Sequence, residues 1–216
     1  PSIEYARSQM PYDIVPGLAI AAEGEVLTVR LYYRGDLNSV RRVALDTSSR
    51  TSVALLRILL HERYGLQPLW LDAKPDLSAM LEVADAALLI GDSVFAELPN
   101  EVSSLDLGSE WFAHTALPFV FAFWAGRPGA LGAEEVAALQ AAKEAGLEHV
   151  GQIARDYAQK HGGDVDLYVR YLTQHIRFAM GEREVESLRL FYVKAQQLEL
   201  IEAVPPLSFF AGENER

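Results

Sequence analysis

Val43-Ala44-Leu45-Asp46-Thr47-Ser48-Ser49-Arg50-Thr51-Ser52, continuing into the apolar run Val53 to Leu60, is the stretch that decides the fold. An apolar strand leads into five hydroxyl side chains, and a helix begins within or just after them. Such a junction directs free backbone N–H groups, short hydroxyls and the positive end of the helix dipole at one point. An anion, either a carboxylate or a phosphate, is the ligand that this arrangement favours.

A structural role for the same hydroxyls is the alternative. Thr47, Ser48 or Ser49 would cap the helix by accepting a first-turn N–H, a contact worth ~1 kcal/mol. One cap requires one such residue, and the chain supplies five. Arg50 either pairs with the bound anion or faces solvent. At this point both interpretations stay open.

Strands and helices alternate outward from this junction. Residues 43–46, 69–71 and 86–90 are apolar and short enough to be buried strands, and residues 51–64 and 75–83 have helical spacing. A strand, helix, strand, helix, strand order predicts a parallel sheet built by crossover connections. The compact α/β unit is expected to cover roughly residues 38–113.

The rest of the chain flanks this unit. Further elements are expected as a short helix or turn at 2–9, extended segments at 14–22 and 26–33, an extended or irregular stretch at 103–115, an apolar strand at 117–124, and helices at 133–143, 148–160, 165–180 and 182–198. These last helices must cover a sheet, and most of that sheet is not in the sequence. The pattern therefore predicts a two-lobed α/β protein that lacks part of its first lobe, and an N-terminus without Met fits that expectation.

Composition narrows the classes of partner. The chain has 216 residues, 30 acidic against 19 basic side chains and a formal charge of −11. This balance argues against nucleic acid and against an anionic membrane surface. No apolar run approaches the ~20 residues of a membrane span, and the N-terminus lacks the order of a signal peptide. Cysteine is absent, which excludes a thiolate nucleophile and fits a cytoplasmic location.

Three polar residues outside the junction are candidates for the site. Asp92 follows the strand 86–90, where ligands of open α/β sheets gather, although a helix N-cap is the simpler role. Thr28 lies in an extended segment, where threonine is commonly only a strand former. His114 is the one histidine near the expected cleft. The five histidines show no ligand spacing, so no metal is expected.

Several segments together resemble the chorismate dehydratase family of the futalosine route to menaquinone. They are Pro1 to Tyr5, Ser48 to Ser52, Asp85 to Asp92, Asp106 to Trp111, Leu117 to Trp124 and, more loosely, Tyr171 to Tyr192. The SSRTS and IGD motifs in this order are more specific than either alone. The resemblance implies a type II periplasmic-binding-protein-like fold, in which two crossing strands join two α/β lobes that hold the ligand between them.

This resemblance implies a division of the chain into three segments. Residues 1–33 would form the remainder of lobe 1 and the first crossing strand, 34–115 the inserted lobe 2, and 116–216 the return strand and the C-terminal helices of lobe 1. Proteins of the family begin several dozen residues earlier, and that part supplies an active-site Asn. Ala116 replaces a usual Gly, and Thr28 stands where some members have an active-site Ser, so the hydroxyl is kept and a methyl is added.

The activity implied is dehydration of chorismate, a dianion, to 3-[(1-carboxyvinyl)oxy]benzoate, with no cofactor. Thr28 is expected to be catalytic, and the substrate-binding residues are expected to be Ser2, Thr28, Ser48, Ser49, Arg50, Thr51, Ser52, Asp92 and His114. The general base is left open between Asp92, His114 and a substrate carboxylate. The alternatives are a non-catalytic carboxylate receptor or sensor of the same fold, and the later enzyme that acts on a futalosine-derived nucleoside. The sequence leaves the oligomeric state open.

Overall fold

The computed structural model describes residues 1–95 and 101–211, with only the backbone of residue 95. Their elements, in chain order, are α1 (Ser2–Arg7), β1 (Asp13–Ala22), β2 (Val29–Tyr33), η1 (Leu37–Ser39), β3 (Arg42–Asp46), α2 (Arg50–Tyr64), β4 (Leu69–Ala73), α3 (Leu77–Val83), β5 (Ala86–Ile90), η2 (Gly91–Phe95), β6 (Ser103–Asp106), α4 (Leu107–Thr115), β7 (Phe119–Gly126), α5 (Ala133–Glu148), α6 (Val150–His161), α7 (Val165–Arg170), η3 (Tyr171–His175) and α8 (Glu182–Gln197). The expected α/β class is confirmed. No helix in the described ranges is long and apolar enough to cross a membrane.

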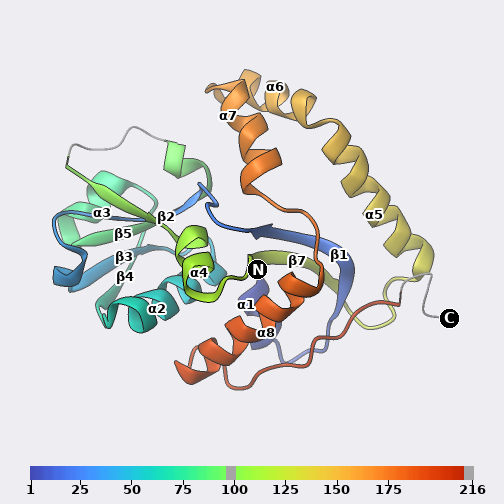
Figure 1. Cartoon of the computed structure of the whole chain (residues 1–216), viewed down its shortest axis with the longest axis horizontal. Helices are drawn as coiled ribbons and strands as arrows, with labels where there is room; N and C mark the ends of the chain where they lie inside the picture. The colour runs from blue at the N-terminus through green and yellow to red at the C-terminus, as the bar shows by residue number, and fades with distance from the viewer. Residues whose placement is uncertain (96–100, 212–216) are drawn as a thin grey trace.

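A five-stranded sheet forms the left part of the molecule in Figure 1, with the strand order β4-β3-β5-β2-β6. β3 is parallel to both β4 and β5, as the strand and helix alternation predicts. β2 runs antiparallel to its neighbours β5 and β6. The carboxyl ends of β3 and β5 and the start of β2 therefore meet at one edge of the sheet, which we call the ligand edge.

β1 and β7 form a separate antiparallel pair, the two long strands that run side by side to the right of α1 (Figure 1). Their register breaks between Ile14 and Ala19. Pro16 lies in this break and cannot donate to the strand ladder, and Gly17 has a positive φ of 75°. α5 lies along this pair, and α6 and α7 turn back from it toward the sheet.

One large apolar core joins the two groups of strands. Leu31 and Leu45 of the five-stranded sheet, Trp111 of α4 and Phe119 of β7 all belong to this core. The Trp111 ring packs against Phe119 and Phe191, and its indole N–H donates to Ser187 Oγ at 3.0 Å. The Trp111 ring is packed on its apolar faces and its N–H is hydrogen-bonded. Because Trp111 lies in α4 and both Ser187 and Phe191 lie in α8, these contacts fix the two helices against each other.

Residues 103–115 differ from the extended or irregular stretch that the sequence predicts. After the short strand β6, residues 107–115 form the helix α4, since the Asp106 carboxylate accepts the Ser109 N–H at 3.0 Å and caps it. Gly108 is needed in its first turn, where a Cβ would lie 2.4 Å from the carbonyl oxygen of Gly24. The start of α4 thus depends on a tertiary contact between Gly108 and Gly24. Such a contact produces no helical periodicity in the sequence, so the helix was not predicted.

The helix predicted at 165–180 is also shorter than expected. α7 ends at Arg170, a π-helical turn covers η3, and the backbone is extended from Ile176. Arg177 and Ala21 exchange backbone hydrogen bonds at 2.8 and 2.9 Å. Pairing with β1 therefore replaces the last turns of the predicted helix.

Candidate active site

One of the hydroxyl residues at the start of α2 caps the helix. Ser49 is the N-cap: its Oγ accepts the Ser52 N–H at 3.3 Å and lies 2.9 Å from Ser52 Oγ. The Ser48 N–H donates to Asp46 Oδ1 at 2.9 Å, which shapes the loop before the helix. The Ser48 side chain is exposed and Ser49 is half-buried. The capping alternative thus accounts for Ser49 and Ser52, whereas Ser48 presents its hydroxyl to solvent.

Two further hydroxyls join α1, α2 and β7 in the interior. Thr51 Oγ1 accepts the Ile3 N–H at 3.2 Å, and Ser2 Oγ donates to the carbonyl of Val120 at 2.9 Å. Thr51 and Ser2 are fully buried, and Ser52 is 1% exposed. The structure therefore encloses these three predicted substrate-binding residues, and it also buries Thr28, which is 5% exposed. Ser48, Ser49 and the 65% exposed Arg50 side chain stay accessible.

Thr28 lies at the ligand edge, immediately before β2. Its carbonyl accepts the Gly91 N–H at 2.8 Å, and its Oγ1 lies 3.0 Å from the hydroxyl of Tyr171. Burial raises the pKa of Tyr171, the hydrogen bond to Thr28 opposes this rise, and the charge of Asp92 adds to it. Sequence reasoning did not identify Tyr171 as a site residue, because aromatic spacing on a helix carries no sign of a hydroxyl pair.

The loop that presents Thr28 is held by a buried carboxylate. Asp106 accepts the Val26 and Leu27 N–H groups at 3.0 and 2.8 Å while it caps α4. Burial raises the pKa of Asp106, against the effect of its backbone donors and of Arg30. Leu27 has a positive φ of 70°, a strained conformation for a γ-branched side chain. Asp106 therefore holds the backbone conformation directly before Thr28, a role that sequence reasoning did not assign.

Asp92 follows β5 at the same edge. The Tyr157 hydroxyl of α6 donates to Asp92 Oδ2 at 2.6 Å, and this hydrogen bond raises the pKa of Tyr157 to about 12. Leu45 of β3 pairs with Leu88 of β5, and Ile90 of β5 pairs with Val29 of β2. Neighbouring strands are ~5 Å apart, so the loops after β3 and before β2 lie on the order of 10 Å apart. The structure brings the start of α2, Thr28 and Asp92 to this one edge.

His114 is not part of this group. Its Nε2 lies 2.7 Å from Glu62 Oε2, which also accepts from Lys194 at 2.5 Å. Burial acts to raise the pKa of Glu62, but the hydrogen bonds from Lys194 and His114 outweigh it and lower the pKa. Nearly the whole of α2 separates Glu62 from Ser49, about 20 Å at 1.5 Å per residue. The structure places His114 in a surface ion cluster at the far end of that helix.

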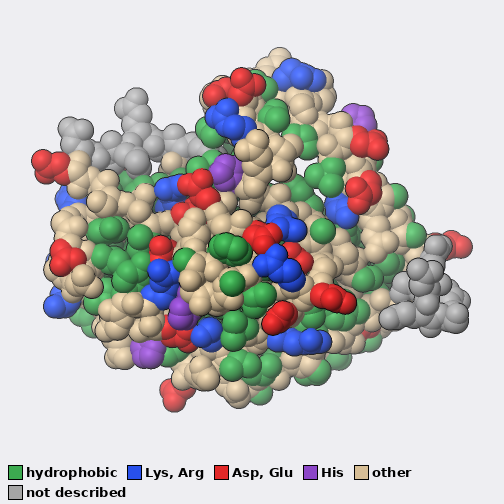
Figure 2. All heavy atoms as spheres, viewed as in Figure 1, with side chains coloured by type: hydrophobic (Ala, Val, Ile, Leu, Met, Phe, Trp, Pro, Cys, Tyr) green, Lys and Arg blue, Asp and Glu red, His purple; other side chains and the backbone are tan. Residues whose placement is uncertain are grey.

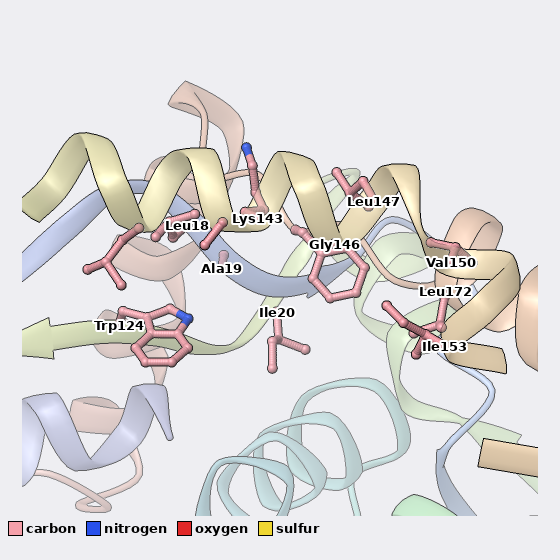
Figure 3. A pocket seen from close by; sticks show the side chains of 13 residues that line it. Leu18, Ala19, Ile20, Trp124, Lys143, Gly146, Leu147, Val150, Ile153 and Leu172 are labelled. Atoms are coloured by element: carbon pink, nitrogen blue, oxygen red, sulfur yellow. The ribbon is translucent and has the colours of Figure 1, made fainter. Parts of the chain in front are cut away.

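An apolar groove of about 460 Å³ lies elsewhere, between α5 and α6 on one side and β1 and β7 on the other. Figure 3 shows Trp124 and Ile20 facing it from the strands and Leu147 and Ile153 lining it from the helices. Among the described residues that line it, Lys143 is the single charged one. Such a surface offers no set of convergent donors for a dianion. Among the described residues no group of three or more His, Asp or Glu is placed to hold a metal ion.

Acidic and basic side chains are interspersed over the face seen in Figure 2, rather than gathered into one basic patch. Local donors therefore matter more than the overall field for a negatively charged ligand. At the ligand edge the donors are Ser48, Ser49 and Arg50 around the start of α2 and the hydroxyl pair of Thr28 and Tyr171. Together they suit an anionic ligand that also carries a hydroxyl group.

Comparison with known proteins gives the following matches. Residues 1–197 match the family described as menaquinone biosynthesis. The chain is 34% identical over 209 residues to the chorismate dehydratase of Thermus thermophilus, covering 87% of this chain and 74% of that protein.

Two solved structures are similar in fold. One is protein AF1704 from Archaeoglobus fulgidus, with a TM-score of 0.73, 20% identity, and coverage of 93% of this chain and 78% of the other. The second is an ABC transporter from Parabacteroides distasonis, with a TM-score of 0.65, 12% identity, and coverage of 99% and 78%.

Proposed function

The chain belongs to the menaquinone biosynthesis family, and from this premise we propose that it is a chorismate dehydratase of the futalosine route. The observation that carries the proposal beyond family membership is the ligand edge. There a capped helix start, the Thr28 and Tyr171 hydroxyl pair and the carboxylate of Asp92 come together. A dianion with a leaving hydroxyl needs hydrogen-bond donors for its carboxylates, a hydroxyl group to assist the leaving oxygen, and one base to accept the ring proton.

The reaction removes one molecule of water from the substrate ring. A ring proton leaves, its C–H electron pair becomes the last double bond of the aromatic ring, and the neighbouring C–O bond breaks to release the hydroxyl. The products are 3-[(1-carboxyvinyl)oxy]benzoate and water. Because aromatisation favours the products, the protein chiefly has to hold the ring so that this elimination is the one that occurs.

One carboxylate of the substrate is proposed to bind at the start of α2. The accessible donors there are the hydroxyls of Ser48 and Ser49 and the guanidinium of Arg50, next to the positive end of the helix dipole. Thr51, Ser52 and Ser2 hold this helix start from the interior rather than contact the ligand. In this assignment the enclosed hydroxyls supply rigidity and the exposed ones supply binding.

The departing hydroxyl is proposed to meet the pair formed by Thr28 and Tyr171. A hydrogen bond donated by either group stabilises negative charge on the leaving oxygen. Asp92 is then the carboxylate placed to accept the ring proton, and its hydrogen bond from Tyr157 fixes its orientation. His114 takes no part, because its cluster lies about 20 Å along α2 from Ser49.

We also propose a two-lobed, type II periplasmic-binding-protein-like organisation. β1 and β7 would be the crossing strands, and the five-stranded sheet with α2 to α4 would be the inserted lobe. β2 falls within the predicted segment 1–33, but it pairs with β5 and β6. The proposed boundary of the inserted lobe therefore lies before β2, and α1 and α5 to α8 belong to the other lobe.

The test is direct incubation with chorismate, followed by mass spectrometry and ultraviolet absorbance. Dehydratase activity gives an aromatic product lighter than chorismate by one water, and the Thr28→Val variant should form it more slowly. Binding without conversion would favour the receptor alternative. Neither binding nor conversion, with conversion of a futalosine-derived nucleoside instead, would favour the later enzyme of the route.

A further inference from the structure

Arg57, on the outer face of α2, has an unusual environment. Its Nε is buried and has no hydrogen-bond partner, the single such side-chain nitrogen or oxygen within residues 1–95 and 101–211. Its guanidinium lies over the Trp70 ring, whose centroid is 5.0 Å away. A buried donor without an acceptor is costly, so native structures rarely keep one unless an ion or a water supplies the acceptor.

This group lines a pocket of about 380 Å³ between α1, α2, β4 and the segment after α8. Arg7, Arg50 and Thr47 share the lining with Arg57, and Asp72 is the one carboxylate among the described residues that line it. Burial and the neighbouring guanidinium of Arg7 lower the pKa of Arg57, and Asp72 opposes them. The pocket therefore concentrates positive charge in a protein whose formal charge is −11.

The other two arginines are partly committed. Arg7 donates to the Leu200 carbonyl at 3.2 Å and to Glu4 at 3.3 Å, and Arg50 donates to Glu4 at 2.8 Å. Glu4 thus offsets part of the charge of Arg7 and Arg50, and it has no hydrogen bond or ion pair with Arg57. A planar guanidinium with a free edge is suited to bind two oxygens of one oxyanion side by side.

We propose that this pocket is an oxyanion site, in which Arg57 and Arg7 bind a carboxylate or phosphate group. Arg57 lies over the Trp70 ring, which limits the positions that its guanidinium can take, and the guanidinium groups of Arg57 and Arg7 supply the N–H donors to the bound oxyanion. Asp72 repels a second negative charge, so the site favours singly charged oxyanions. The inference does not rest on the proposed function, since neither arginine belongs to the proposed catalytic group.

The experiment measures binding of two probes, inorganic phosphate and acetate, by titration calorimetry at constant ionic strength, with chloride as the compensating ion. Wild-type protein is compared with Arg57→Gln, Asp72→Asn and the control Arg155→Gln, an exposed arginine of α6. We expect Arg57→Gln to weaken binding at least tenfold, Asp72→Asn to strengthen it about threefold and Arg155→Gln to leave it unchanged. Binding of one probe alone identifies the group as phosphate or carboxylate.

A second measurement separates this role from a purely structural one. Thermal unfolding of wild type and Arg57→Gln is compared in buffer without either oxyanion and with each oxyanion added. The added oxyanion should then raise the melting temperature of wild type but not of Arg57→Gln. Absence of binding to wild type, or equal binding by Arg57→Gln, would overturn the proposal.

Discussion

Thr28 is the residue at which backbone strain, a buried hydroxyl pair and the proposed leaving group meet. Its side chain is 5% exposed and its Oγ1 lies 3.0 Å from the Tyr171 hydroxyl. Thr28→Val keeps the shape and removes the hydroxyl, so we expect kcat/KM for chorismate to fall by roughly tenfold to a hundredfold. Thr28→Ser keeps the hydroxyl and should retain most of the activity. Steady-state kinetics with Thr28→Val equal to wild type would exclude this residue from the reaction.

Glu62 provides a prediction of how stability depends on pH. Its pKa in the folded protein lies below the ordinary value of 4.5, because the hydrogen bonds from Lys194 and His114 outweigh burial. A lowered acid pKa stabilises the fold above pH 4.5, and this contribution is lost as the pH falls through the folded-state value. Glu62→Gln should therefore cost about 1 kcal/mol at neutral pH and progressively less below pH 4.5. Urea denaturation across the pH range measures the free energy of unfolding of wild type and of Glu62→Gln. A difference between the two proteins that does not change with pH would contradict this account.

At the scale of elements, two hydroxyls at the start of α2 have different roles. Ser49 caps the helix, and Thr51 links it to α1 in the interior. Ser49→Ala removes the cap and should lower the free energy of unfolding by ~1 kcal/mol while it weakens substrate binding. Thr51→Val leaves the buried Ile3 N–H without an acceptor and should cost roughly 1–3 kcal/mol with little direct effect on binding. Ser48→Ala is the matched control for stability, since its exposed hydroxyl makes no such contact. Chemical denaturation and titration with chorismate distinguish the two roles, and identical behaviour of Ser49→Ala and Thr51→Val would contradict them.

Elements whose apolar periodicity is local were predictable, and those set by tertiary contacts were not. The strand at 43–46 and the helix that follows it appear in the structure close to where the sequence puts them. α4 was missed because its first turn depends on the Asp106 cap and on Gly108 packing against Gly24. The end of the helix predicted at 165–180 was missed because pairing between Arg177 and Ala21 replaces it.

At the scale of the whole molecule, the ligand edge could be predicted in part. Thr28 and Asp92 were identified from strand ends and from family resemblance, and the structure brings both to one edge of the sheet. Tyr157 and Tyr171 could not be, because they are far along the chain and their spacing is that of ordinary core aromatics. Enclosure of Ser2 and Thr51 was equally hidden, since a hydroxyl in the sequence does not show which way it faces.

Tyr157 and Tyr171 together connect α6, α7 and η3 to the ligand edge, the region where α7 descends toward the sheet in Figure 1. His175 adds a third contact, with its Nδ1 3.1 Å from the Glu25 carbonyl. The pKa of Tyr157 is raised to about 12, so this hydroxyl stays a donor below pH 10.0 and loses that role only as the pH rises through about 12. The connection should therefore persist throughout the physiological range of pH.

Tyr157→Phe removes the hydrogen bond to Asp92 and leaves the ring in place. We expect faster amide hydrogen exchange in residues 150–175 and around Asp92, a several-fold higher KM for chorismate, and no change in exchange within α2. Tyr168→Phe is the matched control, because the Tyr168 hydroxyl donates to Gly162 within the same pair of helices at 2.9 Å. If exchange rises equally in both variants, the effect belongs to the packing of α6 on α7 and not to the contact with the sheet. If it rises in Tyr157→Phe alone, the contact with Asp92 is what holds these helices against the ligand edge.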